Sequence, residues 1–215
     1  TMTVLAGIAL LVIVKPLYNG ESWARGAALL ALSFPSIGGA YMIVPWMNFV
    51  GTKYGGFPPA VATMMIGLIP FFAILLMDKG DKQQKIVDFL VFLAMGVTAS
   101  YSFANGHAAF RVLYGHPKRP MFAEGIAITF VGFIGLWMAW WFLSAAIYQL
   151  GTRKESGWYL MLIGGLFAML AGFATGVVRY TTVDYWLNGL LGLSCVVLAL
   201  IPLFKERLLK KYEAE

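Results

Sequence analysis

The stretch Gly125–Gln149 constrains the fold most, because it is predominantly apolar and no charged residue lies between Glu124 and Arg153. At about 1.5 Å per residue, roughly 20 residues of helix cross the ~30 Å apolar layer of a bilayer. The composition agrees, since 60% of the residues are hydrophobic and 12% are charged, against about 25% charged in soluble domains. We therefore predict an all-α integral membrane protein.

Intervals without charge predict seven transmembrane helices in one polytopic domain, residues 1–204, followed by a short basic tail, residues 205–215. The predicted spans are approximately Thr3–Leu17, Ala27–Val50, Pro58–Met77, Ile86–Asn105, Gly125–Gln149, Trp158–Val178 and Trp186–Phe204. The first is short, because it is bounded by Lys15. Either the helix continues past Lys15, whose side chain then reaches the interface, or the segment belongs to a helix that starts earlier in a longer chain. If this first segment is not a full span, the sequence predicts six spans.

The basic residues divide unequally between the two sides of such a bundle. Eleven of the sixteen fall on the side of the C-terminus and five on the other. Because cytoplasmic loops are rich in Lys and Arg, we predict an outer N-terminus and a cytoplasmic C-terminus in the cell membrane. The cations form short clusters between apolar runs, which favours anionic lipid head groups over nucleic acid as partners. The tail from Lys205 onward is interpreted either as an amphipathic helix on the cytoplasmic leaflet or as a solvated end.

The predicted second helix is irregular, because it contains Pro35, Gly38, Gly39 and Pro45. Each proline removes a backbone donor and clashes with the preceding turn, so we expect a kink or a break near the middle. One interpretation is a discontinuous helix whose freed backbone groups line a solute site. The other is a kinked packing helix, since Pro and Gly are common in membrane helices.

Two predicted helices have stripes of small residues at helical spacing, which allow another backbone to approach closely. The stripes comprise Gly132, Gly135 and Ala139 in one helix, and Gly164, Ala168, Gly172 and Gly176 in the next. The connection between these helices is short, so we expect antiparallel neighbours whose small faces meet.

Bulky aromatic residues lie on a different face of the helix Gly125–Gln149. At 100° per residue they fall within an arc of roughly 100°. They are Phe130, Phe133, Trp137, Trp140, Trp141 and Tyr148. Lipid, a neighbouring subunit and a flat apolar ligand such as a quinone are the three candidates for what this face contacts.

The longest loop of this prediction contains both histidines, His107 and His116, on the outer side. Together with Glu124 and Asp184 they could bind a metal ion. The spacing of the two histidines is not diagnostic of a metal site, so ordinary surface histidines are the alternative.

The sequence lacks the residues that several classes of membrane protein and enzyme require. Ionisable residues mark proton relays and charged-substrate paths inside membranes, but Asp88, Arg179 and Asp184 all fall near the ends of predicted spans. Trp186–Phe204 has no lysine that could form a retinal Schiff base, which excludes a microbial rhodopsin. The sequence also lacks phosphate-binding, metalloprotease and serine-hydrolase motifs, and its one cysteine excludes an intrachain disulfide.

The sequence therefore predicts a non-catalytic, multi-spanning subunit of a larger membrane complex, such as a respiratory or other energy-conserving complex. It would pack partner helices or a hydrophobic ligand such as a quinone. A small transporter or channel for neutral or hydrophobic solutes, built around a broken second helix, is the alternative. A lipid-modifying enzyme would need the outer polar residues as its catalytic group.

Overall fold

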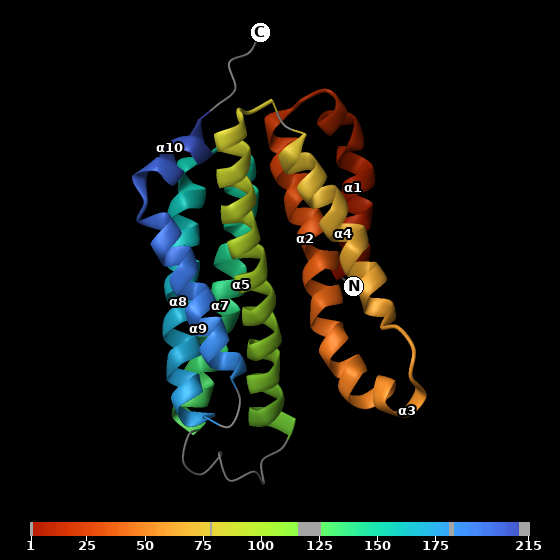
Figure 1. The fold of residues 1–215 in the computed structure, drawn as a ribbon, viewed down its shortest axis with the longest axis vertical. Coiled ribbons are helices and arrows are strands. Elements are labelled where there is room, and N and C mark those ends of the chain that lie inside the picture. The colour runs from red at the N-terminus through yellow and green to blue at the C-terminus, as the bar shows by residue number, and fades with distance from the viewer. Residues whose placement is uncertain (1, 78, 116–125, 181–182, 211–215) are drawn as a thin grey trace.

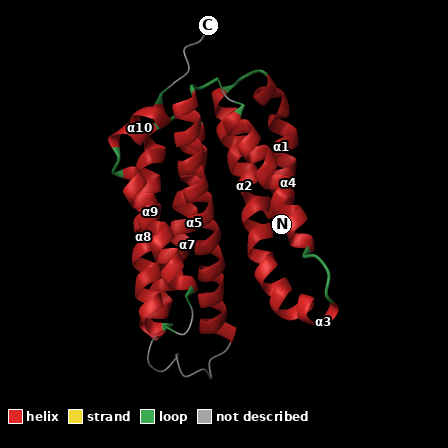
Figure 2. Cartoon of the chain, in the orientation of Figure 1, coloured by secondary structure: helices red, strands yellow, loops and turns green. Residues whose placement is uncertain are grey.

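A computed structural model describes residues 2–77, 79–115, 126–180 and 183–210, and the described part of the chain contains helices and no strand (Figure 2). Within these residues, five helices are long and apolar enough to cross a membrane: α2 (Ser22–Pro45), α4 (Pro59–Leu76), α5 (Lys82–Gly115), α7 (Ile126–Gly151) and α8 (Glu155–Val178). A sixth span results if α9 (Asp184–Ala199) and α10 (Pro202–Leu209) count as one broken helix. The protein is thus an all-α, multi-span membrane protein.

The remaining helical segments are short. The first, α1 (Met2–Tyr18), has 17 residues, and at about 1.5 Å per residue it covers roughly 25 Å. Its first residues lie about half-way along the length of the bundle (Figure 1). A seventh full span therefore stays a prediction. A π-helical segment (Trp46–Gly51) and the single turn α3 (Thr52–Tyr54) extend α2 at the opposite end.

The helices form two groups (Figure 1). In the first group, α1 and α4 pack against α2. In the second, α7 packs against α5 and α8, and α9 packs against α8 and α5. The helix α2 joins the groups, because it contacts both α5 and α7. Buried apolar side chains fill this junction, among them Leu29, Phe92, Met95, Leu143 and Ile147.

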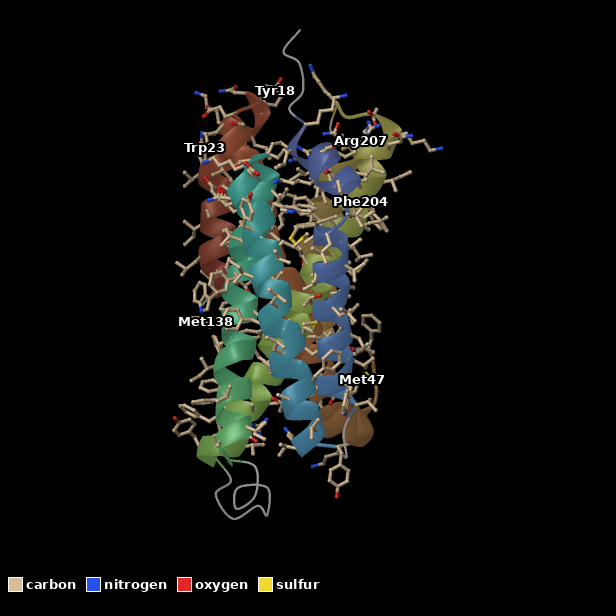
Figure 3. The ribbon with its side chains drawn as sticks, turned by 90° about the vertical axis from the view of Figure 1, so that its left-hand side faces the viewer. Tyr18, Trp23, Met47, Met138, Phe204 and Arg207 are labelled. Atoms are coloured by element: carbon tan, nitrogen blue, oxygen red, sulfur yellow. The ribbon has the colours of Figure 1, made fainter. Side chains whose placement is uncertain are left out.

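One end of the bundle collects the connections α1–α2, α4–α5 and α7–α8 together with α10 (Figure 1). Tyr18, Trp23 and Arg207 lie at this end in Figure 3, whereas Met47 lies toward the other. We call it the basic end, because its described cations are Lys15, Arg25, Lys79, Lys82, Lys85, Arg153, Lys154, Lys205, Arg207 and Lys210. All ten are among the eleven cations that we predict from the sequence to lie on the side of the C-terminus. Which side of the membrane this is remains a prediction.

The helix α2 runs without a break through Pro35, Gly38 and Gly39, so of the expected kink or break near its middle the break is absent. Hydroxyl groups next to the proline bond to the helix's own carbonyl oxygens, because Ser33 donates to Leu30 at 2.6 Å and Ser36 to Leu32 at 2.8 Å. Such bonds let membrane helices accommodate proline.

Gly39 has a packing role in α2. A β-carbon built on it would lie 2.5 Å from the backbone nitrogen of Met64 in α4. The hydrogen-bonding pattern changes only after Pro45, where the π-helical segment begins.

Two predicted boundaries are wrong. The helix α5 continues to Gly115, so His107 lies on a helix and not in a loop. Arg111 ended the charge-free interval, but a long cationic side chain near a helix end does not stop the helix. The predicted span Trp186–Phe204 is divided, because α9 ends at Ala199 and α10 starts at Pro202, bent by 77°. The expected domain boundary at residue 205 thus falls inside α10.

Candidate functional site

A buried ion pair lies at the basic end. Nη1 and Nη2 of Arg153 donate to Oδ1 and Oδ2 of Asp88, each at 2.6 Å. The Asp88 side chain is 1% exposed and that of Arg153 is 6% exposed. This two-fold contact matches the planar guanidinium to the planar carboxylate, and it joins α5 to the connection between α7 and α8.

Arg153 holds its position through an unusual backbone conformation. Its φ is 57°, and among the described residues no other non-glycine residue has a positive φ. The N–H of Lys154 donates to the carbonyl of Gln149 at 2.9 Å, and the N–H of Arg153 donates to that of Leu150 at 2.9 Å. These two bonds form a Schellman motif, in which glycine usually takes the left-handed position. A side chain there costs about 1–2 kcal/mol, and Asp88 offsets this cost by binding the guanidinium.

Arg25 connects α2 to the same cluster. Its Nη1 donates to the carbonyl of Gly151 at 2.7 Å, and its Nη2 lies 3.7 Å from Oδ2 of Asp88. The backbones of α2 and α7 approach closely here, since a β-carbon on Gly26 would lie 2.5 Å from the carbonyl oxygen of Tyr148. The charged cluster therefore fixes how the two helix groups meet.

The helix α10 closes over this cluster. Arg153 donates to the carbonyl of Leu208 at 3.0 Å, and the Leu208 side chain is fully buried. Two exposed ion pairs add to the contact: Lys205 with Glu155 at 2.6 Å and Arg207 with Asp81 at 2.9 Å. The sequence predicts that these two cations contact lipid head groups, but both have acidic partners within the chain. Contact of the tail with lipid stays a prediction.

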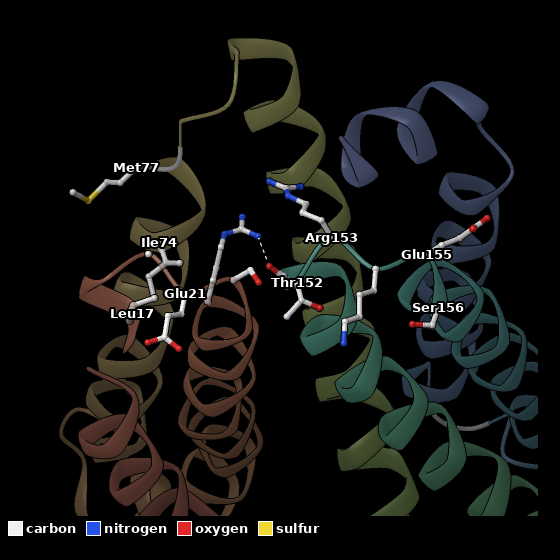
Figure 4. Close-up of a pocket in the computed structure, with 13 residues that line it drawn as sticks. Leu17, Glu21, Ile74, Met77, Thr152, Arg153, Glu155 and Ser156 are labelled. Carbon is white, nitrogen blue, oxygen red and sulfur yellow. Dashed lines mark hydrogen bonds between the residues drawn. The ribbon is translucent and has the colours of Figure 1, made fainter. Parts of the chain in front are cut away.

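A cavity of about 860 Å³ opens beside the cluster, between the two helix groups (Figure 4). We call it the basic-end cavity. One wall comes from the first group and the other from the α7–α8 connection. Its lining residues are Leu17, Gly20, Glu21, Ser22, Arg25, Ile74, Met77, Gly151, Thr152, Arg153, Lys154, Glu155 and Ser156.

A second cavity, of about 260 Å³, lies farther along the same junction, between α2, α4, α5 and α7. We call it the seam cavity. Its lining residues are Ser33, Ser36, Ile37, Ala40, Met64, Leu68, Phe71, Phe72, Phe92, Leu93, Gly96, Val97, Ser100, Tyr101 and Ile147. The three serine hydroxyls bond to carbonyl oxygens of their own helices, at 2.6 to 2.9 Å. The cavity therefore presents an apolar surface despite its serines.

The aromatic face of α7 is partly covered by the chain's own helices, an occupant that the sequence prediction did not consider. Phe133 packs on Phe110 of α5 with ring centroids 5.6 Å apart, and Trp137 packs on Phe103 at 5.6 Å. Trp140 packs on Phe103 at 5.2 Å and on Phe34 of α2 at 6.3 Å, and it is 3% exposed. The helical wheel identified the shared face, but α5 and α2 fill the space in front of these three rings.

The rest of that face differs. Trp141 is 52% exposed and Phe130 is 43% exposed. The Tyr148 side chain is partly buried. Contact with lipid, a subunit or a ligand thus concerns mainly Phe130 and Trp141.

The small residues of α7 and α8 lie at close helix contacts. A β-carbon on Gly132 would meet Thr175, one on Gly135 would meet Ala171, and one on Gly164 would meet Leu143. In α8, Gly172 and Gly176 lie against α9 instead of α7. Ala139 and Ala168 are fully buried. The stripe on α8 therefore serves two neighbouring helices.

Of the candidate metal ligands, the structure describes His107 and Asp184, and these two do not come together. His107 packs against the ring of Tyr41 in α2, with ring centroids 5.4 Å apart. Asn105, two positions earlier, donates to the backbone carbonyl of Asp184 at 3.1 Å, and residues two apart point to nearly opposite sides of a helix. His116 and Glu124 lie outside the described residues. Within the described ranges, no three side chains of His, Cys, Asp or Glu form a metal-binding group.

Sequence reasoning missed the pair of Asp88 and Arg153. It placed Asp88 near a helix end and Arg153 in a connection, and it assigned neither a role. A usable signal was present, because Asp88 lies between the apolar residues Val87 and Phe89. A carboxylate within an apolar run predicts a cationic partner.

No protein-family model matches this chain, and neither a curated protein nor a solved structure matches it. A functional proposal therefore depends on the geometry alone.

Proposed function

We propose that this chain is a non-catalytic, multi-spanning membrane protein that holds a hydrophobic ligand in the seam cavity. The observation that supports this most is the chemical character of the cavity. Its serine hydroxyls are bonded within their own helices, so apolar groups of Phe71, Phe92 and Ile147 dominate what a ligand would contact.

The volume narrows the ligand class. The cavity has about 260 Å³, just below the range of roughly 300–1,000 Å³ for drug-sized sites. An alkyl or isoprenoid chain fits such a volume better than a broad ring system. Leu93 and Tyr101 at its rim are exposed, so a chain could enter sideways from the bilayer. A quinone would meet this requirement through its isoprenoid tail.

Cavity filling tests this proposal. A β-carbon on Gly96 meets nothing within 4 Å, so Gly96→Leu extends a side chain into the cavity without a backbone clash. Gly7→Leu is the matched control, because Gly7 has equal space but lies on α1, away from the cavity. We expect native mass spectrometry of the purified protein to show a bound apolar molecule that Gly96→Leu removes and Gly7→Leu retains. Equal retention in both variants would refute the proposal.

We further propose that the chain works as a subunit of a larger membrane complex. Trp141 supports this, because a half-exposed tryptophan near the middle of a long helix lies away from the interface where membrane tryptophans concentrate. Mild detergent extraction should yield stable partners that are lost with Trp141→Ala and Phe130→Ala. The control is Ile66→Ala, which removes an exposed apolar side chain from α4. A protein that purifies alone would contradict the subunit proposal.

A transporter for hydrophobic solutes is the second candidate, because both cavities lie along one junction between two helix groups. It no longer depends on a broken α2. Reconstituted vesicles should then move an apolar solute across the bilayer, and Gly96→Leu should block that movement.

A further inference from the structure

We infer that the basic-end cavity binds a phosphate-type anion, which makes the ligand of this protein an anionic amphiphile with its head group at the basic end and its chain in the seam cavity. The part of this inference that places the ligand's apolar chain in the seam cavity rests on the proposed function. The anion site is argued from its own residues.

Cations from both helix groups line the cavity. Arg25 comes from α2, whereas Arg153 and Lys154 come from the α7–α8 connection. The Arg25 side chain is 13% exposed, so its charge is little screened by solvent. Among the described residues, no hydrogen bond or ion pair engages the Lys154 ammonium group, which leaves it available to an anion.

Two helices also begin at this cavity. Ser22 starts α2 and Glu155 starts α8, and neither helix has a side-chain cap hydrogen bond. The N–H groups of a first helical turn attract anions. The hydroxyl group of Ser22 in the same lining can donate a hydrogen bond to a phosphate oxygen, whereas that of Ser156 donates to Oε1 of Gln149 at 3.3 Å.

The carboxylates near the cavity are engaged by other groups. Glu155 accepts from Lys205 at 2.6 Å and from Tyr159 at 3.2 Å, and its side chain points away from Thr152 (Figure 4). Glu21 accepts from the indole N–H of Trp23. Asp88 binds Arg153. The acidic residues therefore do not oppose an anion as strongly as their number suggests.

The two cavities are spaced for one amphiphilic molecule. On α2, Arg25 lines the first cavity and Ser33 the second, and eight helical residues correspond to about 12 Å. On α4, Ile74 lines the first and Phe71 the second, one helical turn away. The basic-end cavity is also apolar on one side, where Leu17, Ile74 and Met77 lie, as a glycerol or chain segment next to a phosphate requires.

A lipid-competition experiment tests the inference on the full chain. The protein is placed in phosphatidylcholine nanodiscs that contain phosphatidic acid as the anionic probe, and bound lipid is counted by native mass spectrometry. We expect selective retention of phosphatidic acid, weakened about tenfold in Lys154→Gln and in Arg25→Gln, as for loss of one charge-assisted hydrogen bond. Arg111→Gln is the control, because Arg111 is an exposed arginine at the other end of α5.

Competition by inorganic phosphate distinguishes a lipid head group from a free anion as the ligand of this site. If added inorganic phosphate does not displace phosphatidic acid, the site takes a lipid head group. If it displaces the lipid completely, the site takes a free phosphate-type anion, and the anion site stands without the link to a chain. Equal phosphatidic acid retention in Lys154→Gln, Arg25→Gln, Arg111→Gln and the unaltered protein would overturn the inference.

Failure of this inference can be told apart from failure of the proposed function. If the cation variants keep full selectivity while Gly96→Leu still loses an apolar molecule, the seam cavity binds a neutral ligand. If Gly96→Leu changes nothing while the cation variants lose phosphatidic acid, the anion site exists alone. Arg25 also bonds to Gly151, so the surface residue Lys154 provides the test if Arg25→Gln does not fold.

Discussion

Arg153 and Asp88 lie 65 residues apart in the sequence, yet both carboxylate oxygens of Asp88 accept hydrogen bonds from the Arg153 guanidinium at 2.6 Å. This one contact links the start of α5 to the α7–α8 connection. Through Leu208 it also reaches α10. The stability of the basic end should therefore depend on it more than on any surface ion pair.

We predict that Asp88→Asn lowers the free energy of unfolding by about 3–5 kcal/mol, because it leaves a buried guanidinium without its full counter-charge. Unfolding in mixed micelles, followed by circular dichroism, measures the change. The control is Asp81→Asn, which removes an exposed carboxylate from a surface pair, and surface pairs contribute at most about 1 kcal/mol. Similar small effects of both substitutions would contradict the prediction.

The left-handed conformation of Arg153 gives a second prediction. In an Asp88→Leu background, where the guanidinium has lost its main partner, Arg153→Gly should be more stable than Arg153→Ala by about 1 kcal/mol, because glycine adopts a positive φ without strain. The same pair of substitutions at Lys154 is the control. Its φ is −94°, so glycine should gain nothing there. The same micelle assay would decide, and a Gly–Ala difference of equal size at both positions would exclude backbone strain at Arg153.

Close packing of α8 against α9 gives a third prediction. A β-carbon on Gly192 would lie 2.4 Å from the backbone nitrogen of Met169 and 2.7 Å from the carbonyl oxygen of Gly165. Gly192→Ala should therefore cost about 1–3 kcal/mol, as overpacking does. Gly96→Ala, which meets no atom within 4 Å, should not destabilise the fold. Thermal unfolding in detergent compares the two, and equal melting temperatures would show that the backbones can separate at little cost.

The contact of α10 should depend on pH through Asp81. The Gln84 N–H, which donates to Asp81 at 2.8 Å, and the nearby Arg207 guanidinium hold the pKa of Asp81 below its usual 3.8. Because the folded pKa is lowered, the contribution to stability is complete above the usual value and is lost as the pH falls through the lowered one. A spin label on α10 should gain mobility in this acidic range. Asp81→Asn should reduce that change and leave the part that comes from Glu155, whose hydrogen bond from Lys205 of α10 likewise lowers its pKa. An unaltered pH profile in this variant would assign the whole change to another group.

Orientation can be tested directly. In a Cys195→Ser background, a membrane-impermeant thiol reagent added to intact cells should label Lys53→Cys but not Lys154→Cys, because we place the basic end in the cytoplasm. Permeabilised cells, in which both should react, provide the control. The reverse labelling pattern would place the basic end outside.

Hydropathy was sufficient to predict an all-helical membrane protein, because each span needs a long apolar run and this chain has several. The starts and ends of α4 and α8 fall within a few residues of the predicted spans. Hydropathy failed to predict the helix ends where a charged residue does not coincide with the end of a helix. Arg111 interrupts the apolar run without ending α5, and the chain turns at Pro202 while it is still apolar.

The site was harder to predict, because periodicity says which residues share a face and not which helix they meet. The wheel grouped Trp137 with Trp140 correctly but could not show that Phe103 of α5 lies against both. The serines around Pro35 have the same limitation. Their sequence positions do not show that their hydroxyl groups donate hydrogen bonds to carbonyl oxygens of their own helix. These bonds make the seam cavity apolar.

The pairing of Asp88 with Arg153 also has a consequence for the order of biosynthesis. Translation proceeds from the N-terminus, so Asp88 reaches the membrane 65 residues before Arg153 does. During that interval α5 holds a carboxyl group near the apolar layer without the guanidinium that later binds it, and Leu208 arrives a further 55 residues after Arg153. Until the α7–α8 connection has been made, Arg25, which lies 3.7 Å from Asp88 in the folded chain, is the earlier cation that can balance this carboxylate. In chains interrupted before residue 153, the counter-charge of Asp88 should therefore depend on Arg25.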